Sequence, residues 1–421
     1  MTDDINIISK YFTALKKSGI DSTKSAFCYF SSSEVALGYS NFLRIKKKIG
    51  TLKLLFEHIK NISGILTQEG YMITHKNNHK KDFKSLIITW AYRNSFDHDG
   101  NLFDRYLGIN SKKTKNTIWF VIYLDQKEPV KVSSNIILLK KQKTFFLNKL
   151  YYLIKVFLKV IRVSGYQLKK INHYFTTEFN FANIIVDKLS ALIELKRIRE
   201  IRMPYESQIF QNEIYKFAKR RNKKIKNLAF LTYTHPLSKE LIFDRSNQID
   251  KLYLYNKNQR KVFIEYLKWP SRNIKFIQKN ANFRERKNIY TNKVFLPYFF
   301  KDSDSIVKSF ENYLKLFNKE INIKQLIIQQ HPSPYNPSKQ LMLKKKLIKI
   351  IKKFSDKKKI KYKKNLSIVI GLSSLPIKLI KSKINFIHIS NDEENQIFSN
   401  KYWHNLKYKQ IMKNIFKYYN A

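Results

Sequence analysis

A histidine followed by a proline stands at position 331, directly after the apolar run of residues 325–330. If that run is a strand, His331 lies at its C-terminal edge, where the imidazole can donate to a phosphate oxygen or a sugar hydroxyl. Pro332 fixes the turn and disfavours helix at the residue before it. The alternative is a turn in which the histidine is exposed and has no function. A His-Pro pair by itself more often has this structural role.

A glycine and two serines, Gly371, Ser373 and Ser374, follow the apolar run of residues 366–370 and precede a helical pattern. Glycine lets the backbone turn tightly, and serines at a helix start offer hydroxyls and free N–H groups to an anion. An ordinary serine N-cap would give the same pattern. The runs before His331 and Gly371 are expected to be neighbouring strands, so these residues could converge on one phosphate.

One carboxylate, Glu206, lies in the run of residues 203–208, which opens a predicted helix over residues 205–220. Pro204 suits a first helical turn, and an acid there complements the helix dipole. That explanation is sufficient by itself. The functional alternative is a carboxylate that acts as a general base or sugar ligand between two domains.

Two further carboxylates, Asp97 and Asp99, lie in the polar segment of residues 94–108. The segment lacks the terminal acidic ligand of an EF-hand loop, so we interpret it as a loop on the acceptor side rather than a calcium site. His235, which follows the apolar run of residues 227–233, is expected in another turn at a strand's C-terminal edge.

The elements that position these residues follow a strand, turn and helix rhythm, which is typical of parallel-sheet domains. We predict an α/β fold of two Rossmann-like lobes that face an interdomain cleft, because ligands of open α/β sheets bind at the C-terminal ends of the strands. Strands are predicted at residues 25–30, 85–91, 117–124, 134–139, 227–233, 251–255, 273–277, 325–330, 366–370 and 384–389, and helices at 184–198, 205–220, 305–317, 339–354 and 403–419.

The predicted domains are an N-terminal acceptor-side lobe (1–215), a C-terminal nucleotide-sugar lobe (216–402) and a terminal helix (403–421) that can pack back on the first lobe. The boundary is placed at the basic connector of residues 219–226. No short repeat is visible, so a solenoid is not expected.

The formal net charge is +51, from 82 Lys and Arg against 31 Asp and Glu in 421 residues. Such an excess favours polyanions, including nucleic acid, anionic membrane and phosphorylated substrates. The charge is mostly lysine and runs along the whole chain, so solvated faces are an equal explanation. No zinc finger, RNP-like strand or P-loop is present, and we expect no specific nucleic-acid partner.

The single cysteine, Cys28, excludes an intramolecular disulfide and a cysteine-based zinc site. The N-terminus lacks the features of a signal peptide, and no apolar run approaches about 18 residues. We therefore expect a cytoplasmic protein.

A predicted helix over residues 145–162 places Lys155, Lys159 and Arg162 on one face, which suits an anionic bilayer surface. A half-buried helix with a solvated basic face is the alternative; the lysine-rich segment of residues 341–364 has the same two interpretations.

Together these motifs resemble the bacterial glycosyltransferases of GT-B fold that build surface polysaccharides such as capsule and O-antigen. The His331-Pro332 and Ser373-Ser374 pairs look like those of polysialyltransferase-type enzymes, in which they hold the phosphate of a CMP-activated sugar. Those enzymes carry an acidic-acidic-Gly motif as base, and the nearest match here, residues 97–100, has a histidine inserted. The base therefore stays open between Glu206 and the Asp97/Asp99 pair.

The resemblance implies metal-independent and cofactor-free transfer, of inverting type, from a nucleotide-sugar donor to a glycan or lipid-linked glycan acceptor. It implies donor binding by His331, Pro332, Gly371, Ser373 and Ser374, with His235 nearby. The positive charge adds the expectation of a peripheral position on the inner face of the cytoplasmic membrane. Three alternatives stay open: a CDP-polyol phosphate transferase of the teichoic-acid type, a basic nucleic-acid-binding protein, and an inactive member of a polysaccharide assembly complex.

Overall fold

The computed structural model describes most of the chain beyond residue 50. The predicted strand at residues 25–30, and three predicted site residues, His235, Pro332 and Ser374, lie outside the described residues. Those described are residues 51–75, 83–114, 116–143, 145–164, 171, 174–192, 197–206, 208–231, 248–254, 260–266, 268–277, 292–297, 300, 302–317, 322–331, 336–355, 366–371, 373, 375–381, 384–390 and 407–419.

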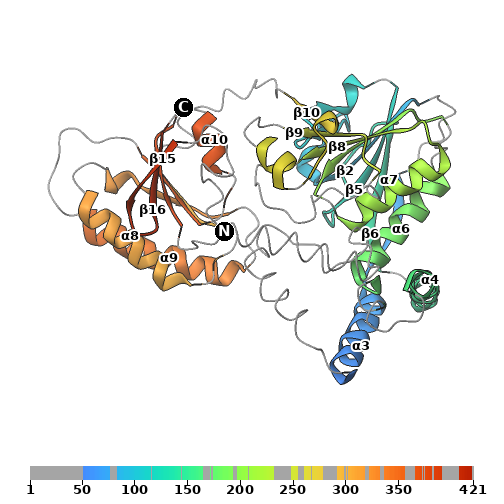
Figure 1. Ribbon diagram of the computed structural model, residues 1–421, viewed down its shortest axis with the longest axis horizontal. Helices are drawn as coiled ribbons and strands as arrows, with labels where there is room; N and C mark the ends of the chain where they lie inside the picture. The colour runs from blue at the N-terminus through green and yellow to red at the C-terminus, as the bar shows by residue number, and fades with distance from the viewer. Residues whose placement is uncertain are drawn as a thin grey trace.

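The first half of the described chain forms an eight-stranded sheet in the order β1-β6-β5-β2-β7-β8-β9-β10 (Figure 1). Only β1 is antiparallel to its neighbour. If the parallel strands are numbered in chain order, they run 3-2-1-4-5-6-7, so the order reverses between β2 and β7. The strands are β1 (Gly70–His75), β2 (Ser85–Ala91), β5 (Thr117–Tyr123), β6 (Ile136–Gln142), β7 (Glu200–Tyr205), β8 (Lys226–Leu231), β9 (Lys251–Leu254) and β10 (Ile274–Phe276).

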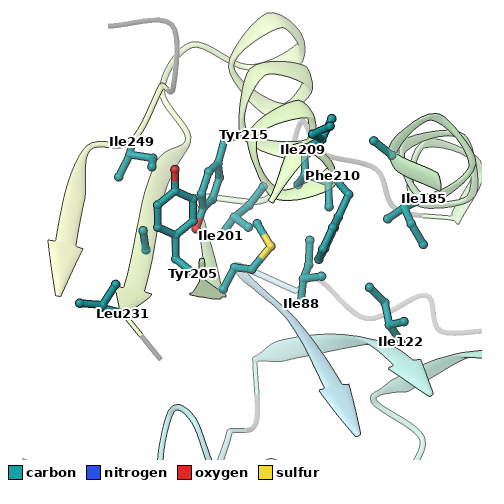
Figure 2. Close-up of a cluster of buried hydrophobic side chains, with 14 of the residues drawn as sticks. Ile88, Ile122, Ile185, Ile201, Tyr205, Ile209, Phe210, Tyr215, Leu231 and Ile249 are labelled. Carbon is teal, nitrogen blue, oxygen red and sulfur yellow. The ribbon is translucent and has the colours of Figure 1, made fainter. Parts of the chain in front are cut away.

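Helices cover one face of this first sheet, and a loop segment covers the other. Leu86 and Ile88 of β2 join the buried cluster of the helices, part of which Figure 2 shows, with Ile88 among its labelled residues. Ile87, which points to the opposite face, packs in a second cluster with Leu102 and Leu107. The helices are α3 (Thr51–Thr67), α4 (Phe146–Ser164), α6 (Thr177–Leu192) and α7 (Ile209–Arg221); the loop segment contains the short strands β3 (Phe103–Asp104) and β4 (Ile109–Asn110).

The second half forms a six-stranded sheet in the order β12-β11-β13-β14-β16-β15. The first four of these strands are parallel, and their order reverses between β11 and β13. Helices α8 (Ser303–Phe317) and α9 (Pro337–Ser355) cover one face, and α10 (Leu375–Lys381) lies on the other. The strands are β11 (Lys293–Phe295), β12 (Ile327–Gln329), β13 (Ser367–Ile370), β14 (Phe386–Ile389), β15 (Lys407–Met412) and β16 (Ile415–Tyr419).

These two sheets, whose parallel strands reverse their order once in each sheet, confirm the predicted α/β class and the pair of Rossmann-like lobes. The predicted terminal helix over residues 403–419 is wrong, because its described part is the hairpin of β15 and β16. Asn414 turns the hairpin in the left-handed region (φ 65). The tyrosines and phenylalanine of this segment favour a strand, and this preference outweighs its helical apolar pattern.

The sheets also place the domain boundary later than predicted. Residue 215 lies inside α7, and β8, β9 and β10 all belong to the first sheet. The change from one sheet to the other falls between Phe276 and Lys293. The basic connector at residues 219–226 therefore links α7 to β8 within one lobe.

The loop face of the first sheet depends on a glycine, Gly100. Its φ is +81, and an added Cβ would lie 2.6 Å from the backbone carbon of Lys131. Gly108 also has a positive φ (+69), but an added Cβ there meets nothing within 4 Å.

We predict that Gly108→Ala costs about 1 kcal/mol of unfolding free energy, from backbone strain alone. Gly100→Ala should cost at least about 2 kcal/mol, because it adds a backbone clash. Urea unfolding of both variants tests this, and equal losses would contradict it.

Candidate active site

The two strands at the reversal point of the first sheet separate before they end. β2 pairs with β5 along its whole length, and β7 pairs with β8 along its whole length. The ladder between β2 and β7, however, joins only residues 85–87 to residues 200–202. Beyond Arg202 the two strands therefore lack each other as hydrogen-bond partners, and side chains must satisfy the exposed backbone groups.

Gln211 of α7 satisfies one of these groups at the end of β7, and its side chain is fully buried. Its Nε2 donates to the carbonyl oxygen of Pro204 at 2.7 Å. Its Oε1 accepts from the backbone N–H of Glu206 at 3.0 Å and of Gln208 at 2.9 Å. One amide group therefore ties the end of β7 to the start of α7 and fixes the backbone of Glu206.

Glu206 thus lies at the C-terminal edge of the first sheet, directly after β7. The run of residues 203–208 was predicted to open a helix, and this is wrong: Pro204 and Tyr205 end the strand, and α7 begins at Ile209. Pro204 is tolerated because it lies beyond the ladder with β2, where no N–H donor toward β2 is needed. The Glu206 carboxylate is half-buried and accepts from Gln208 Nε2 at 2.9 Å.

A tyrosine on the β3–β4 turn, Tyr106, lies near Glu206. Burial, and after it the negative charge of Glu206, raise the pKa of Tyr106 to about 12. Its ring packs edge-on against Trp90, at 5.6 Å between ring centroids, and Trp90 packs against Phe210 of α7 at 6.0 Å. The phenol therefore stays protonated at neutral pH and can donate a hydrogen bond beside the carboxylate.

The turn that carries Tyr106 is held by Asp104. This aspartate is buried, and its Oδ1 accepts from the backbone N–H groups of Tyr106 at 2.7 Å and Leu107 at 2.8 Å. Its observed contacts give it a structural use, which is to shape the loop that brings Tyr106 to the sheet edge.

Asp97 and Asp99, the other candidate bases, are exposed and belong to a different part of the loop. Asp97 Oδ1 accepts from the backbone N–H of Asp99 at 3.0 Å and of Asn101 at 2.8 Å. The Asn101 backbone hydrogen bond lowers the pKa of Asp97, with help from the Asn101 side chain. The turn docks on residues 131–133, which lead into the start of β6, whereas Glu206 lies at the C-terminal edge. A carboxylate used in this way is a weak base.

At the edge of the second sheet, Gly371 turns the chain directly after β13. Its φ is +64, and its N–H donates to Ile389 O at 2.7 Å. Ser373 Oγ then accepts from the Leu375 N–H at 3.1 Å, at the start of α10. These contacts match the predicted glycine turn and serine cap, and they place both residues at the reversal point between β11 and β13.

A buried histidine that the sequence analysis missed, His388 of β14, holds this turn. A carbonyl oxygen can only accept, so His388 Nε2 donates to Gly371 O at 2.7 Å. Nδ1 then accepts from the Tyr418 hydroxyl at 3.1 Å. Burial lowers the pKa of His388 to about 4, so the ring is neutral at pH 7. Gln340 of α9 acts similarly at the end of β11, where its Nε2 donates to Pro297 O at 2.8 Å.

His331 follows β12, but β12 and β13 are not neighbours, because β11 lies between them. The expectation that His331 and the serines end adjacent strands is therefore wrong. Two strand spacings of about 4.8 Å separate these strand ends by roughly 10 Å. His331 is half-buried at the outer edge of the sheet. It lies at the same C-terminal edge as Gly371 but on the other side of β11.

Among the described residues, no group of three or more His, Cys, Asp and Glu side chains is placed to hold a metal ion. In the same part of the chain, no helix combines the length and the apolar character needed to cross a bilayer.

The buried His388 predicts a specific pH dependence of stability. The unfolded histidine, with a pKa of 6.5, takes up a proton before the folded one does, so stability falls as the pH drops from about 6.5 to about 4. The loss is roughly 3 kcal/mol. His388→Gln keeps a donor for Gly371 and removes the titration, so its urea midpoint should change less over this range. The exposed His98→Gln is the control, and a slope unchanged in His388→Gln would contradict the assignment.

The structure has weak likenesses to solved structures. An α,α-trehalose 6-phosphate synthase from Burkholderia multivorans is 11% identical, with 73% of this chain and 80% of that chain covered and a TM-score of 0.39. An α,α-trehalose-phosphate synthase (UDP-forming) from Burkholderia vietnamiensis is 13% identical, with 71% and 82% covered and a TM-score of 0.37. The N-terminal domain of a Candida albicans trehalose-6-phosphate phosphatase is 10% identical, with 75% and 83% covered and a TM-score of 0.37.

TM-scores this low do not establish a shared fold, so the fold assignment rests on the topology of the two sheets. The sequence matches no protein-family model and no curated protein.

Proposed function

We propose that this protein is a glycosyltransferase that moves a sugar from a nucleotide donor to an acceptor hydroxyl. One observation carries the proposal: in each sheet, residues suited to the reaction follow a strand at the point where the strand order reverses. They are a carboxylate in the first sheet and a glycine–serine turn in the second. Glu206 follows β7 in the first sheet, and the Gly371–Ser373 turn follows β13 in the second. In open α/β sheets this is where ligands bind.

On the acceptor side, Glu206 is the proposed general base. It takes the proton of the acceptor hydroxyl while that oxygen attacks the anomeric carbon, and the bond from that carbon to the donor phosphate breaks. The attack is a single displacement, so the anomeric configuration inverts. Tyr106 is the proposed positioning partner, because its protonated phenol can donate to a sugar hydroxyl beside Glu206. Asp97 and Asp99 are less suited, because the carboxylate of Asp97 is engaged in its own turn.

On the donor side, the turn after β13 is the proposed phosphate site. Backbone N–H groups and the hydroxyls of Ser373 and Ser374 would stabilise the charge that develops on the leaving nucleotide, without a metal ion. His331, roughly 10 Å away across β11, would contact another part of the same nucleotide rather than the same phosphate. His235 and Pro332 remain proposed neighbours of the donor.

The proposed donor is a CMP-sugar, and the proposed acceptor is a growing surface glycan, of capsule or O-antigen type, or a lipid-linked glycan. The support is the pattern of the His-Pro and Gly-x-Ser-Ser motifs. A lipid-linked acceptor would be met at the inner face of the cytoplasmic membrane.

Glu206→Gln should lower the rate of sugar transfer by about 100-fold to 10,000-fold, because it removes the base but keeps the size and polarity of the side chain. Glu178→Gln is the matched control, since Glu178 is an exposed carboxylate in the first turn of another helix, α6. Donor binding should stay unchanged in both variants. A Glu206→Gln protein with the full transfer rate would exclude Glu206 as the base.

A thermal-shift screen with CMP, CDP, UDP and GDP should show the largest stabilisation with CMP. Ser373→Ala should reduce that shift, because it removes a hydroxyl at the phosphate site, whereas Ser190→Ala on α6 should not. A larger shift with CDP would favour polyol phosphate transfer instead. An identical shift in Ser373→Ala and the wild type would place the phosphate elsewhere.

A further inference from the structure

Helix α4 buries Val156 and Val160 but leaves a second set of apolar side chains exposed. Leu147, Leu150, Ile154 and Leu158 are spaced three or four residues apart and therefore share one side of the helix. Leu147 and Leu158 are 75% and 60% exposed, and Phe146 beside them is 64% exposed. These five residues are the apolar face of α4. A contiguous apolar face on a protein surface marks a site of contact with another phase or molecule.

Lys155 and Lys159 of α4 do not face outward as predicted. Lys155 forms an ion pair with Asp187, and Lys159 Nζ donates to Asn183 Oδ1 at 2.6 Å. Both partners belong to α6, so these lysines fasten α4 to its neighbour. The predicted basic face of Lys155, Lys159 and Arg162 is therefore largely internal, and only Arg162 of the three is exposed. The side of α4 that points away from the protein is the hydrophobic one.

Helix α3, which contacts α4, adds exposed apolar side chains of its own. Phe56 and Ile59 are 69% and 62% exposed. Figure 1 shows α3 and α4 at the lower edge of the first lobe, where α3 extends away from the sheet. Two adjoining helices thus present hydrophobic side chains at a projecting part of the molecule.

The exposed charged side chains that the structure describes on α4 are positive. The sequence of α4 contains no acidic residue, and Arg162 is exposed near its end. Lys143, which precedes the helix, and Lys60 of α3 are exposed as well. A symmetric dimer through this face would place like charges against like charges, because the same patch meets itself. The complementary partner is one that offers negative charge beside a hydrocarbon interior.

We propose that the apolar face of α4, together with α3, docks on an anionic lipid bilayer. The helix would lie in the plane of the interface, with its leucines below the headgroups and Arg162, Lys143 and Lys60 at the level of the phosphates. This inference is independent of the proposed sugar transfer, since it rests on exposure and charge alone.

Vesicle co-sedimentation of the full chain tests the proposal. Wild-type protein should bind vesicles of phosphatidylglycerol and phosphatidylcholine, and should bind pure phosphatidylcholine vesicles much less. The double variant Leu147→Glu/Leu158→Glu should bind the anionic vesicles at least about tenfold more weakly, because two charges replace inserted leucines. Leu316→Glu on α8 of the second sheet is the matched control, since Leu316 is a leucine with 62% exposure; it should bind like the wild type.

Three outcomes would overturn the proposal. The double variant could bind as tightly as the wild type, which would assign binding to the general positive charge. The wild type could fail to bind, which would mean that the face is covered by the protein itself. Size-exclusion chromatography could show a wild-type dimer that the double variant converts to a monomer without a change in vesicle binding, which would make the face an interface between copies.

Discussion

The candidate site depends on the early end of the hydrogen-bond ladder between β2 and β7. If these strands stayed paired to their ends, their backbone groups would satisfy each other and the sheet edge would be closed. Because the ladder stops at Arg202, the carbonyl of Pro204 is left for the Gln211 side chain, which also fixes the N–H of Glu206. A local loss of strand pairing thus creates a defined position for the carboxylate.

Buried side chains also hold the strand ends of the second sheet. His388 donates to Gly371 O after β13, and Gln340 donates to Pro297 O after β11, so buried side chains again satisfy carbonyl groups at strand ends. A buried donor in such a place is costly to lose, because the carbonyl would remain unsatisfied away from water. The backbone at both reversal points is therefore held by buried side chains of the protein interior.

The sequence predicts the elements at these edges better than it predicts what holds them. Short apolar runs followed by a turn identify β2, β5, β8, β9, β13 and β14, because parallel strands are buried on both faces. They also place Gly371 directly after a strand, whereas Glu206 was expected in the first turn of a helix and instead follows β7. Gln211 and His388 escape detection, because a polar residue among apolar ones gives no sign of the carbonyl it will meet. The sequence also does not predict which side of α4 faces the protein. Its lysines could have faced water, and only their contacts with Asp187 and Asn183 show that they do not.

The central claim, that a nucleotide binds at the C-terminal edge of the second sheet, is tested most directly by hydrogen–deuterium exchange with and without CMP. The account predicts slower exchange of the backbone amides in the turn after β13, at residues 371–373, and at His331, with the strands of the first sheet unchanged. Protection confined to the first sheet, or none at either strand end at saturating CMP, would contradict it.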